Sequence, residues 1–552
     1  MNKKLLGLGL SVALSVTSCQ TDNFSNAPTE EEVNNQEFFQ IVNAGTLKSS
    51  ISIANAGVIG IRPSSTARNS DAVANIALEE IAEIIPPEIN GQPLRANHVD
   101  VKGNFAYVAY TKEGATYLGG IDIIDISDAH NPKVVHRLLT SNADINALYI
   151  NENDYLIFTG ASHNPAGTNK TILGYIKVEN GQFTNIYDLD IKLPGQTGVD
   201  VIDYNGITLL FSGSDGIIGY YGLGGRATAF TENTKSNYPD LRSAAFNNNK
   251  LAVLSGEFGL MNMDYSNSFS VNLLSSINTP ELGAESKRTI SWYGDNVLVA
   301  QGASGVGIYN FEQASSIENL PINFLAESAD VTAENKVTNA VSTDDNYIFM
   351  ANGGAGLDIF KLDDNFSVVA EGITEIAGSA NYVKAKGDFL YLASGTGLRI
   401  LKMSEAPVTN DAFLDCASFV PYSGNNNLNV NSNSEVSYSG STTLKHLNVS
   451  GLFNYCGALN IEKSININSN GEFNMSGALS IGNNKNGEKL NLNSGSVLRI
   501  NGSLVIYGDL NLNSGATLEF VGEDSRVYVT GRVRINSGAT VTGNFIDENN
   551  KF

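Results

Sequence analysis

Short runs of alternating apolar and polar residues recur between positions 97 and 401. Such alternation is typical of strands that bury one face. Residues 97–109 and 381–393 carry Asn, Val, Lys-Gly, Phe, Tyr and Ala at the same offsets, and the Lys-Gly step predicts a tight turn between two strands. A third strand is predicted at 120–125 in the first copy and at 397–401 in the last. The unit of this region is therefore an antiparallel hairpin followed by a further strand.

Weaker copies of this unit fill the sequence in between. The copies start at residues 97, 146, 199, 242, 288, 339 and 381, so consecutive starts lie 42 to 53 residues apart. A period in the forties with three or four short strands predicts the blades of a β-propeller. Seven copies predict a seven-bladed ring over residues 96–403, in which stacked sheets hide each other's faces. A parallel α/β sheet is excluded because no helical pattern separates the strands.

The last blade needs an outer strand from elsewhere in the chain. Either residues 80–90 or residues 406–414 would supply it, and a strand from the N-terminal side would also protect the edge of the ring. Residues 72–85, however, have apolar side chains at helical spacing and end at two prolines. We therefore predict a short helix or an irregular segment there, within a stretch (51–95) that packs on the propeller or closes it.

The amino-acid composition changes in the last quarter of the chain. Asn, Ser and Gly dominate from residue 425 onward, and an Asn-Ser-Gly or Asn-Ser-Asn phrase begins at residues 431, 468, 493, 513 and 536. Twenty-odd residues per repeat, with alternating strands between turns, predict a β-solenoid over residues 425–548. A flat β-sandwich is the alternative. A linker is predicted at 404–424, and the expected fold class is all-β throughout.

One phrase of the first repeat carries a family resemblance. Residues 119–135 read Gly-Gly-Ile-Asp-Ile-Ile-Asp-Ile-Ser-Asp-Ala-His-Asn-Pro-Lys-Val-Val and follow the strand at 103–109. This phrase resembles the LVIVD-repeat family of bacterial surface propellers. The resemblance implies a propeller and a surface location. It implies little about activity.

The N-terminal residues predict where the protein is located in the cell. A basic start (residues 2–4) and an apolar run (5–16) precede the sequence Val-Thr-Ser-Cys, which ends at Cys19. The apolar run is too short to span a bilayer, and its ending resembles a bacterial lipobox. We predict a signal peptide (1–18), lipidation of Cys19 and a flexible tether (19–50), which would anchor the protein to the outer membrane at the cell surface. An ordinary secretory signal is the alternative.

Charge and composition limit the classes of partner and cofactor that the chain is expected to bind. The chain has 34 basic and 57 acidic residues, a net charge of −23, which disfavours nucleic acid. The five histidines lack metal-ligand spacing, so no cofactor is predicted, and Ca²⁺ binding by scattered aspartates has no dense loop to support it. Cys416 and Cys456 suit either a disulfide in an oxidising compartment or two buried thiols.

The repeat register gives the candidate site. The first residue of each inner strand is Val199 in one blade and a long polar residue in the other six. If these residues align, they ring one mouth of the central channel and offer donors to an anionic or hydroxyl-rich ligand. The alternative is structural, with Asn satisfying backbone groups and Arg pairing with acids. The six polar candidates are Asn97, Asn146, Arg242, Arg288, Asn339 and Asn381.

No catalytic motif accompanies this ring. The sequence has no nucleophile elbow, no phosphate loop and no paired metal ligands at the required spacing. We therefore favour a lipid-anchored, non-enzymatic binding or adhesion module with a glycan or a surface protein as its ligand. A propeller-based polysaccharide lyase or hydrolase is one alternative. A structural component of an outer-membrane or secretion assembly is another.

Overall fold

The computed structural model describes residues 38–43, 45, 47–53, 56–59, 61, 76–128, 130–163, 169–222, 238–267, 270–283, 289–323, 331–344, 346–362, 368–405, 413–482, 488–522 and 525–552. The predicted signal segment, Cys19 and most of the predicted tether lie outside these residues. The described part is built of strands, with three short 3-10 helices: η2 (Lys48–Ser50), η5 (Ala333–Asn335) and η6 (Cys416–Ser418). None of its helices is long and apolar enough to cross a membrane.

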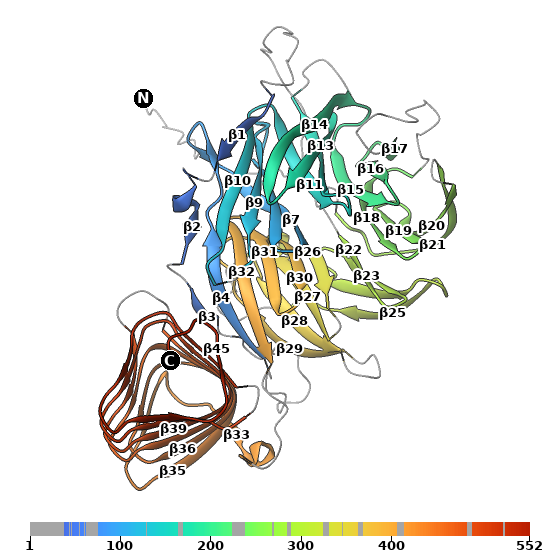
Figure 1. The fold of residues 1–552 in the computed structure, drawn as a ribbon. Coiled ribbons are helices and arrows are strands. Elements are labelled where there is room, and N and C mark those ends of the chain that lie inside the picture. The colour runs from blue at the N-terminus through green and yellow to red at the C-terminus, as the bar shows by residue number, and fades with distance from the viewer. Residues whose placement is uncertain are drawn as a thin grey trace, which may run out of the picture.

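Residues 76–405 form seven antiparallel blades around a common channel (Figure 1). In each blade the first three strands run outward from the channel in chain order, whereas the outermost strands of blades 1 and 7 come from the chain before β7. The innermost strands of blades 1 to 7 are β7 (Arg95–Lys102), β11 (Ala143–Ile150), β15 (Gly198–Tyr204), β18 (Leu241–Asn247), β22 (Ile290–Tyr293), β26 (Lys336–Thr343) and β30 (Ala380–Lys386). The predicted seven-bladed propeller is confirmed.

The remaining strands complete the blades. The second strands are β8 (Phe105–Thr111), β12 (Tyr155–Ser162), β16 (Ile207–Ser212), β19 (Lys250–Ser255), β23 (Asn296–Ala300), β27 (Tyr347–Gly353) and β31 (Phe389–Ser394). The third are β9 (Gly119–Asp125), β13 (Thr171–Glu179), β17 (Ile217–Gly222), β20 (Gly259–Asn267), β24 (Val306–Asn310), β28 (Leu357–Leu362) and β32 (Gly397–Glu405). The fourth are β10 (Lys133–Thr140), β14 (Gln182–Leu193), β21 (Ser270–Ile277), β25 (Ser315–Leu320) and β29 (Val368–Thr374), while blade 3 is described as far as β17.

The chain before β7 covers two blade edges. β1 (Gln40–Asn43) pairs with β10 and becomes a fifth strand of blade 1, although it falls within the predicted tether. β2 (Ile51–Ser52) and β3 (Gly57–Ile59) both pair with β4 (Ile76–Ile84) on the edge of blade 7. A small hairpin of β5 (Glu88–Ile89) and β6 (Gln92–Pro93) then leads into β7. Covered edges are less prone to pair with other chains.

β4 closes the ring, and the helix predicted around it is wrong. It pairs antiparallel with β32, from Ile84 opposite Leu398 to Ile76 opposite Glu405. Ile76 and Leu78 pack into the core shared with blade 6, whereas Ile81 and Ile84 pack into the core shared with blade 1. A strand buried on both faces, with a register shift in its middle, places apolar residues three apart as a helix does.

The C-terminal region is a β-solenoid of parallel strands (Figure 1). Because parallel pairing runs from coil to coil throughout, the alternative of a flat sandwich does not apply. The strands are β33 (Val420–Pro421), β34 (Asn427–Val430), β35 (Glu435–Val449), β36 (Leu452–Ile467), β37 (Glu472–Ile481), β38 (Lys489–Leu492), β39 (Val497–Ile506), β40 (Asp509–Leu512), β41 (Thr517–Phe520), β42 (Arg526–Val529), β43 (Val533–Ile535), β44 (Thr540–Thr542) and β45 (Ile546–Asp547).

Side-chain ladders hold the coils in register. Identical apolar positions stack inside, as Phe453 does on Phe473 with ring centroids 4.8 Å apart. Outside, Asn466 donates its Nδ2–H to Asn448 Oδ1 at 3.0 Å, and Asn491 repeats the bond to Asn466 at 2.9 Å. A one-residue slip would move every apolar side chain to the wrong face, so these ladders fix the pairing.

A disulfide joins Cys416 in η6 to Cys456 in β36, with Cα atoms 5.7 Å apart. The bond fastens the segment that enters the solenoid onto its second long strand. Since both sulfur atoms are used, the alternative of two buried thiols does not apply. A disulfide at this position is consistent with an oxidising compartment.

Candidate binding site in the propeller channel

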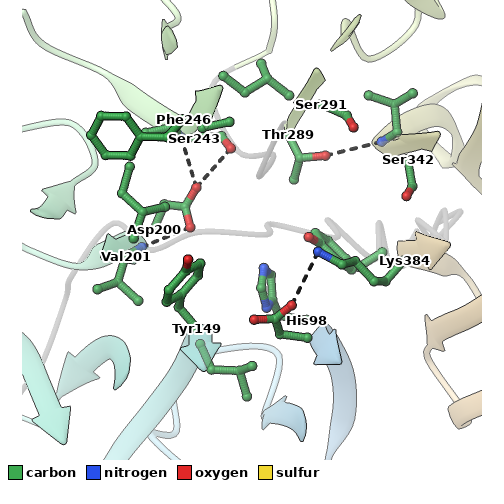
Figure 2. A pocket seen from close by; sticks show the side chains of 18 of the residues that line it. His98, Tyr149, Asp200, Val201, Ser243, Phe246, Thr289, Ser291, Ser342 and Lys384 are labelled. Atoms are coloured by element: carbon green, nitrogen blue, oxygen red, sulfur yellow. Dashed lines mark hydrogen bonds and ion pairs between the residues drawn. The ribbon is translucent and has the colours of Figure 1, made fainter. Parts of the chain in front are cut away.

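A cavity of about 310 Å³ occupies the centre of the propeller (Figure 2). All seven inner strands contribute to its wall, which is the arrangement expected when blades meet at an axis. The side chains that reach it are mainly hydroxyl, carboxyl and aromatic groups. The lining includes His98, Asp100, Tyr149, Asp200, Asp203, Ser243, Phe246, Thr289, Ser291, Trp292, Ser342, Tyr382 and Lys384.

The candidate ring lies immediately beside this wall. A β-bulge interrupts the pairing of five inner strands, and each bulge falls on a residue that the repeat register had aligned: Asn97, Asn146, Val199, Arg242 and Asn381. The recurring bulge shows that these positions are structurally equivalent. None of them lines the cavity. Arg288 lies outside the described residues.

The four asparagines of the ring link neighbouring blades. Each carboxamide donates an Nδ2–H to a main-chain carbonyl on the inner strand of the next blade. Asn97 bonds Ile145 O at 3.0 Å, Asn146 bonds Gly198 O at 3.0 Å, Asn339 bonds Ala380 O at 3.0 Å, and Asn381 bonds Ala96 O at 2.9 Å. The last of these bonds joins blade 7 to blade 1. The placement matches the structural alternative for these residues.

Arg242 has a comparable position and comparable partners. Its guanidinium pairs with Asp240 of the same blade, at 2.7 Å between Nε and Oδ1. Nη2 also donates to Gly283 O at 2.9 Å, on the segment that leads toward blade 5. Arg242 is 6% exposed, so its charge contacts protein groups rather than the cavity.

The polar groups of the cavity itself begin one residue after the bulge. Asp100 and Asp200 each accept hydrogen bonds from the next blade: Ile150 N lies 3.1 Å from Asp100 Oδ2, and Ala244 N lies 3.0 Å from Asp200 Oδ2. Ser243 Oγ is a second donor from that blade to Asp200, at 2.9 Å (Figure 2). Carboxylates held in this way are fixed before any ligand arrives.

Hydroxyl side chains continue the same pattern on the other side of the channel. Thr289 Oγ1 accepts a hydrogen bond from Val341 N at 3.2 Å, and Ser342 Oγ accepts one from Ala385 N at 3.0 Å. Blades 5, 6 and 7 are linked through these two contacts. Hydrogen bonds from the cavity wall thus link blades 1 and 2, 3 and 4, 5 and 6, and 6 and 7, which stiffens the wall.

Lys384 is the ammonium of the cavity wall. Its Nζ lies 3.3 Å from Asp100 Oδ1, and 38% of its side chain stays accessible from the channel. The neighbouring Asp100 carboxylate raises the pKa of Lys384 well above its ordinary value, so the ammonium stays charged at neutral pH. Burial raises the pKa of Tyr149 and of Tyr382 to about 12. Both phenols consequently keep their protons.

Aromatic faces complete the site. The rings of His98 and Tyr382 lie 4.2 Å apart, between blades 1 and 7. Trp292 also lines the cavity, and its Nε1–H donates to Ala245 O of the adjacent blade at 3.1 Å. A wall of hydroxyls, one ammonium, fixed carboxylates and aromatic rings is suited to reversible binding of a polar ligand.

Sequence reasoning missed these residues for a specific reason. The register was anchored on Asn97 and its equivalents, whereas the side chains that face the channel stand one and three positions further on, as His98 and Asp100 do. The bulge consumes one residue before alternation resumes. The sequence did contain a signal for this difference. Asp100 follows Asn97 by three positions, whereas only residues two apart on a regular strand share a face.

The clustered aspartates of β9 and of the turn that follows it bind other groups of the protein. Asp122 pairs with Arg137, Asp125 accepts from Ser127 N at 2.9 Å, and Asp128 accepts from His130 N at 3.2 Å. The structure gathers no set of three His, Cys, Asp or Glu side chains that could hold a metal ion in the part of the chain that it describes.

Two segments of the chain match the sequence profile of the LVIVD repeat, residues 95–140 and residues 377–406. These two segments are similar to the LVIVD repeat. The first matched segment spans β7 to β10, and the second spans β30 to β32. They are the first and last repeats, and their inner strands lie next to each other where the ring closes. The resemblance stated for the first repeat is confirmed, and the last repeat matches the same profile.

Several solved structures are similar in outline. The match with the WD40 repeats of RRP9 covers 62% of this chain and 99% of that structure, with 9% identity and a TM-score of 0.42. The match with the WD40 β-propeller domain of Doa1 covers 62% of this chain and 97% of that structure, with 10% identity and a TM-score of 0.39. The match with the computationally designed Ika8 protein covers 63% of this chain and 96% of that structure, with 11% identity and a TM-score of 0.36. No curated protein matches the chain.

Proposed function

We propose that this protein is a lipid-anchored binding module of the bacterial cell envelope, exposed at the cell surface, that holds a hydroxyl-rich ligand in the propeller channel. The observation that carries the proposal is the polar cavity to which all seven inner strands contribute. At about 310 Å³ it is at the lower end of ordinary ligand pockets, which suits a saccharide unit. A glycan therefore fits the site better than a folded protein domain does.

The chemistry of the wall favours binding over catalysis. Glycoside hydrolysis needs two carboxyl groups that are free to exchange protons or attack the sugar. Asp100 and Asp200 instead accept main-chain N–H bonds from the neighbouring blades. Their oxygens act as fixed acceptors in the wall, which leaves the hydroxyl groups and Lys384 to contact a ligand.

The ligand proposal is tested on the full chain with an immobilised oligosaccharide panel. We expect binding to at least one member, and the double variant Tyr149→Phe/Tyr382→Phe should weaken it about tenfold, because each lost hydroxyl removes a hydrogen bond of about 0.5–1.5 kcal/mol. The matched control is Tyr391→Phe, a buried tyrosine of β31 that does not line the cavity. Equal binding by the double variant would remove the channel from consideration.

The envelope location rests on the sequence that ends at Cys19, and it is tested separately. We expect the full chain expressed in a bacterium to incorporate labelled fatty acid and to sediment with membranes. Cys19→Ser should abolish both properties because the lipid is attached through that sulfur. The control is Cys416→Ser/Cys456→Ser, which removes the other two cysteines and should keep the label. Incorporation that persists in Cys19→Ser would contradict the anchor.

A further inference from the structure

The solenoid contacts the propeller where the ring closes. The ring-closing seam is the pairing of β4 with β32, where the N-terminal part of the propeller meets its last strand. On β4, the Glu79 carboxylate accepts hydrogen bonds from Ser480 Oγ at 3.2 Å and from Tyr507 OH at 3.4 Å. On β32, Lys402 Nζ lies 3.1 Å from Glu548 Oε1. Both strands of the seam therefore contact the solenoid directly (Figure 1).

A second set of contacts reaches blade 1, the next blade around the ring. His130, between β9 and β10, stacks on Tyr528 with ring centroids 4.0 Å apart. Tyr528 belongs to an apolar cluster with Val505, Tyr507 and Ala56. The face of the solenoid formed by β37, β39 and β42 thus spans from blade 7 to blade 1. A rigid body that touches both sides of a seam resists its opening.

We propose that the solenoid clamps the ring-closing seam, and that the clamp is tightest while Glu79 carries its proton. Glu79 is 1% exposed as a residue, although carboxylates are seldom buried without a cation at hydrogen-bond distance. Its oxygens accept hydrogen bonds from the hydroxyls of Ser480 and Tyr507. A neutral carboxyl is compatible with both, whereas an anion at this place is poorly compensated.

The direction of the pH dependence follows from burial. Burial raises the pKa of Glu79 from 4.5 to about 7, against the smaller lowering effect of Lys402. When the clamp is open, Glu79 meets water and its pKa returns to the ordinary value. Closure is therefore coupled to proton uptake, and the stabilisation is complete at low pH and is lost as the pH rises through 7.

Other charged groups at the contact modulate this effect. Lys402, Glu548 and the phenol of Tyr507 face Glu79 directly. Arg526 lies 3.8 Å from Glu548, and burial lowers the pKa of His130, beside Asp128. Because the pKa of His130 is lowered in the closed state, protonation of this side chain opposes closure. The pH dependence that His130 contributes therefore has the opposite sign to that of Glu79. A comparison with a Glu79 variant isolates the carboxyl.

The test is hydrogen exchange of the β4 peptide in the full chain at pH 5.5 and pH 8, corrected for intrinsic rates. In the wild type we expect the opening equilibrium of β4 to increase about thirtyfold more between these pH values than in Glu79→Gln, from a shift between 4.5 and about 7. Glutamine keeps the size and can accept a hydrogen bond but cannot ionise. Amides of β16, on the opposite side of the ring, serve as the internal reference.

The control variant is Asp144→Asn. Burial also raises the pKa of Asp144 to about 7, but this residue lies on β11 in blade 2, away from the solenoid. In Asp144→Asn, the opening equilibrium of β4 should depend on pH as it does in the wild type. If Glu79→Gln does not fold, Lys402→Met provides the second probe, and it should raise exchange of β4 more than exchange of β16. Exchange of β4 that is independent of pH in the wild type, or the same in all variants, would overturn the proposal.

Discussion

Replacing Arg399 with leucine is expected to lower the free energy of unfolding by about 3–5 kcal/mol and to release β4 from the propeller. Arg399 Nη1 lies 2.5 Å from Glu80 Oε2, and both side chains are 5% exposed. Nη2 makes a second contact with Glu83 Oε1 at 3.0 Å. Removal of the guanidinium leaves two acidic groups of β4 inside the protein without their cation. Denaturant unfolding followed by fluorescence measures the loss.

Two further variants give this prediction its controls. The pair Arg399→Leu/Glu80→Leu should recover most of the lost stability, because an apolar pair of similar volume commonly replaces a buried ion pair without cost. Arg532→Leu removes an exposed partner of Asp509 and should change stability by about 0.5 kcal/mol or less. If Arg399→Leu behaves like Arg532→Leu, the ion pair does not hold β4.

The charges at the seam also explain why β4 pairs with the third strand of blade 7 rather than with that of blade 1. In blade 1, Asp122 on the third strand stands opposite Arg137 on the fourth. In blade 7 the order is reversed, since Arg399 on β32 stands opposite Glu83 on β4. An exchange of the two outer strands would place like charges together in both blades. The reversal therefore selects the correct partner by repelling the wrong one.

A third blade shows what happens without such a pair. Asp358 occupies the same position in β28, and the residue opposite is Ile373. Burial raises the pKa of Asp358 to about 8, so this carboxyl keeps its proton at neutral pH. Equivalent aspartates of two blades thus face different residues across the ladder, Arg137 opposite Asp122 and Ile373 opposite Asp358.

The repeats made the ring predictable, whereas its closure was not. Hairpins such as β7–β8 are set by residues that are adjacent in the sequence, and their recurrence fixes the number of blades. The pairing of β4 with β32 joins residues more than 300 positions apart, such as Glu80 and Arg399. Nothing local in β4 distinguishes a strand buried on both faces from an amphipathic helix. Only the two neighbouring cores decide it.

The candidate site was predictable in its location and not in its residues. The repeat register correctly aligned Asn97 with Asn381, but the bulge at that position turns both carboxamides toward the next blade. A strand without a bulge would have directed them differently. The ligand-facing side chains, such as Lys384, depend on where alternation resumes, which is a property of the backbone that single residue types do not reveal.

Replacing Gly477 with alanine should destabilise the solenoid by about 3–5 kcal/mol. Gly440, Gly457, Gly477 and Gly502 stack in one column across four parallel strands, and all have φ between 116° and 133°. A Cβ on Gly477 would lie 2.0 Å from Gly457 O, so the clash adds to the backbone strain. Each effect costs about 1–3 kcal/mol. Thermal unfolding of the full chain, followed by circular dichroism, measures the sum.

Gly515→Ala separates the two contributions. Gly515 also has a positive φ, of 75°, but the nearest atom to an added Cβ is Gly495 N at 3.7 Å. Strain alone should therefore cost about 1–2 kcal/mol at this turn. The difference between the two variants reports the close approach of stacked backbones in the column. Equal losses would show that conformation alone selects glycine there, and that the coils could separate enough to admit a methyl group.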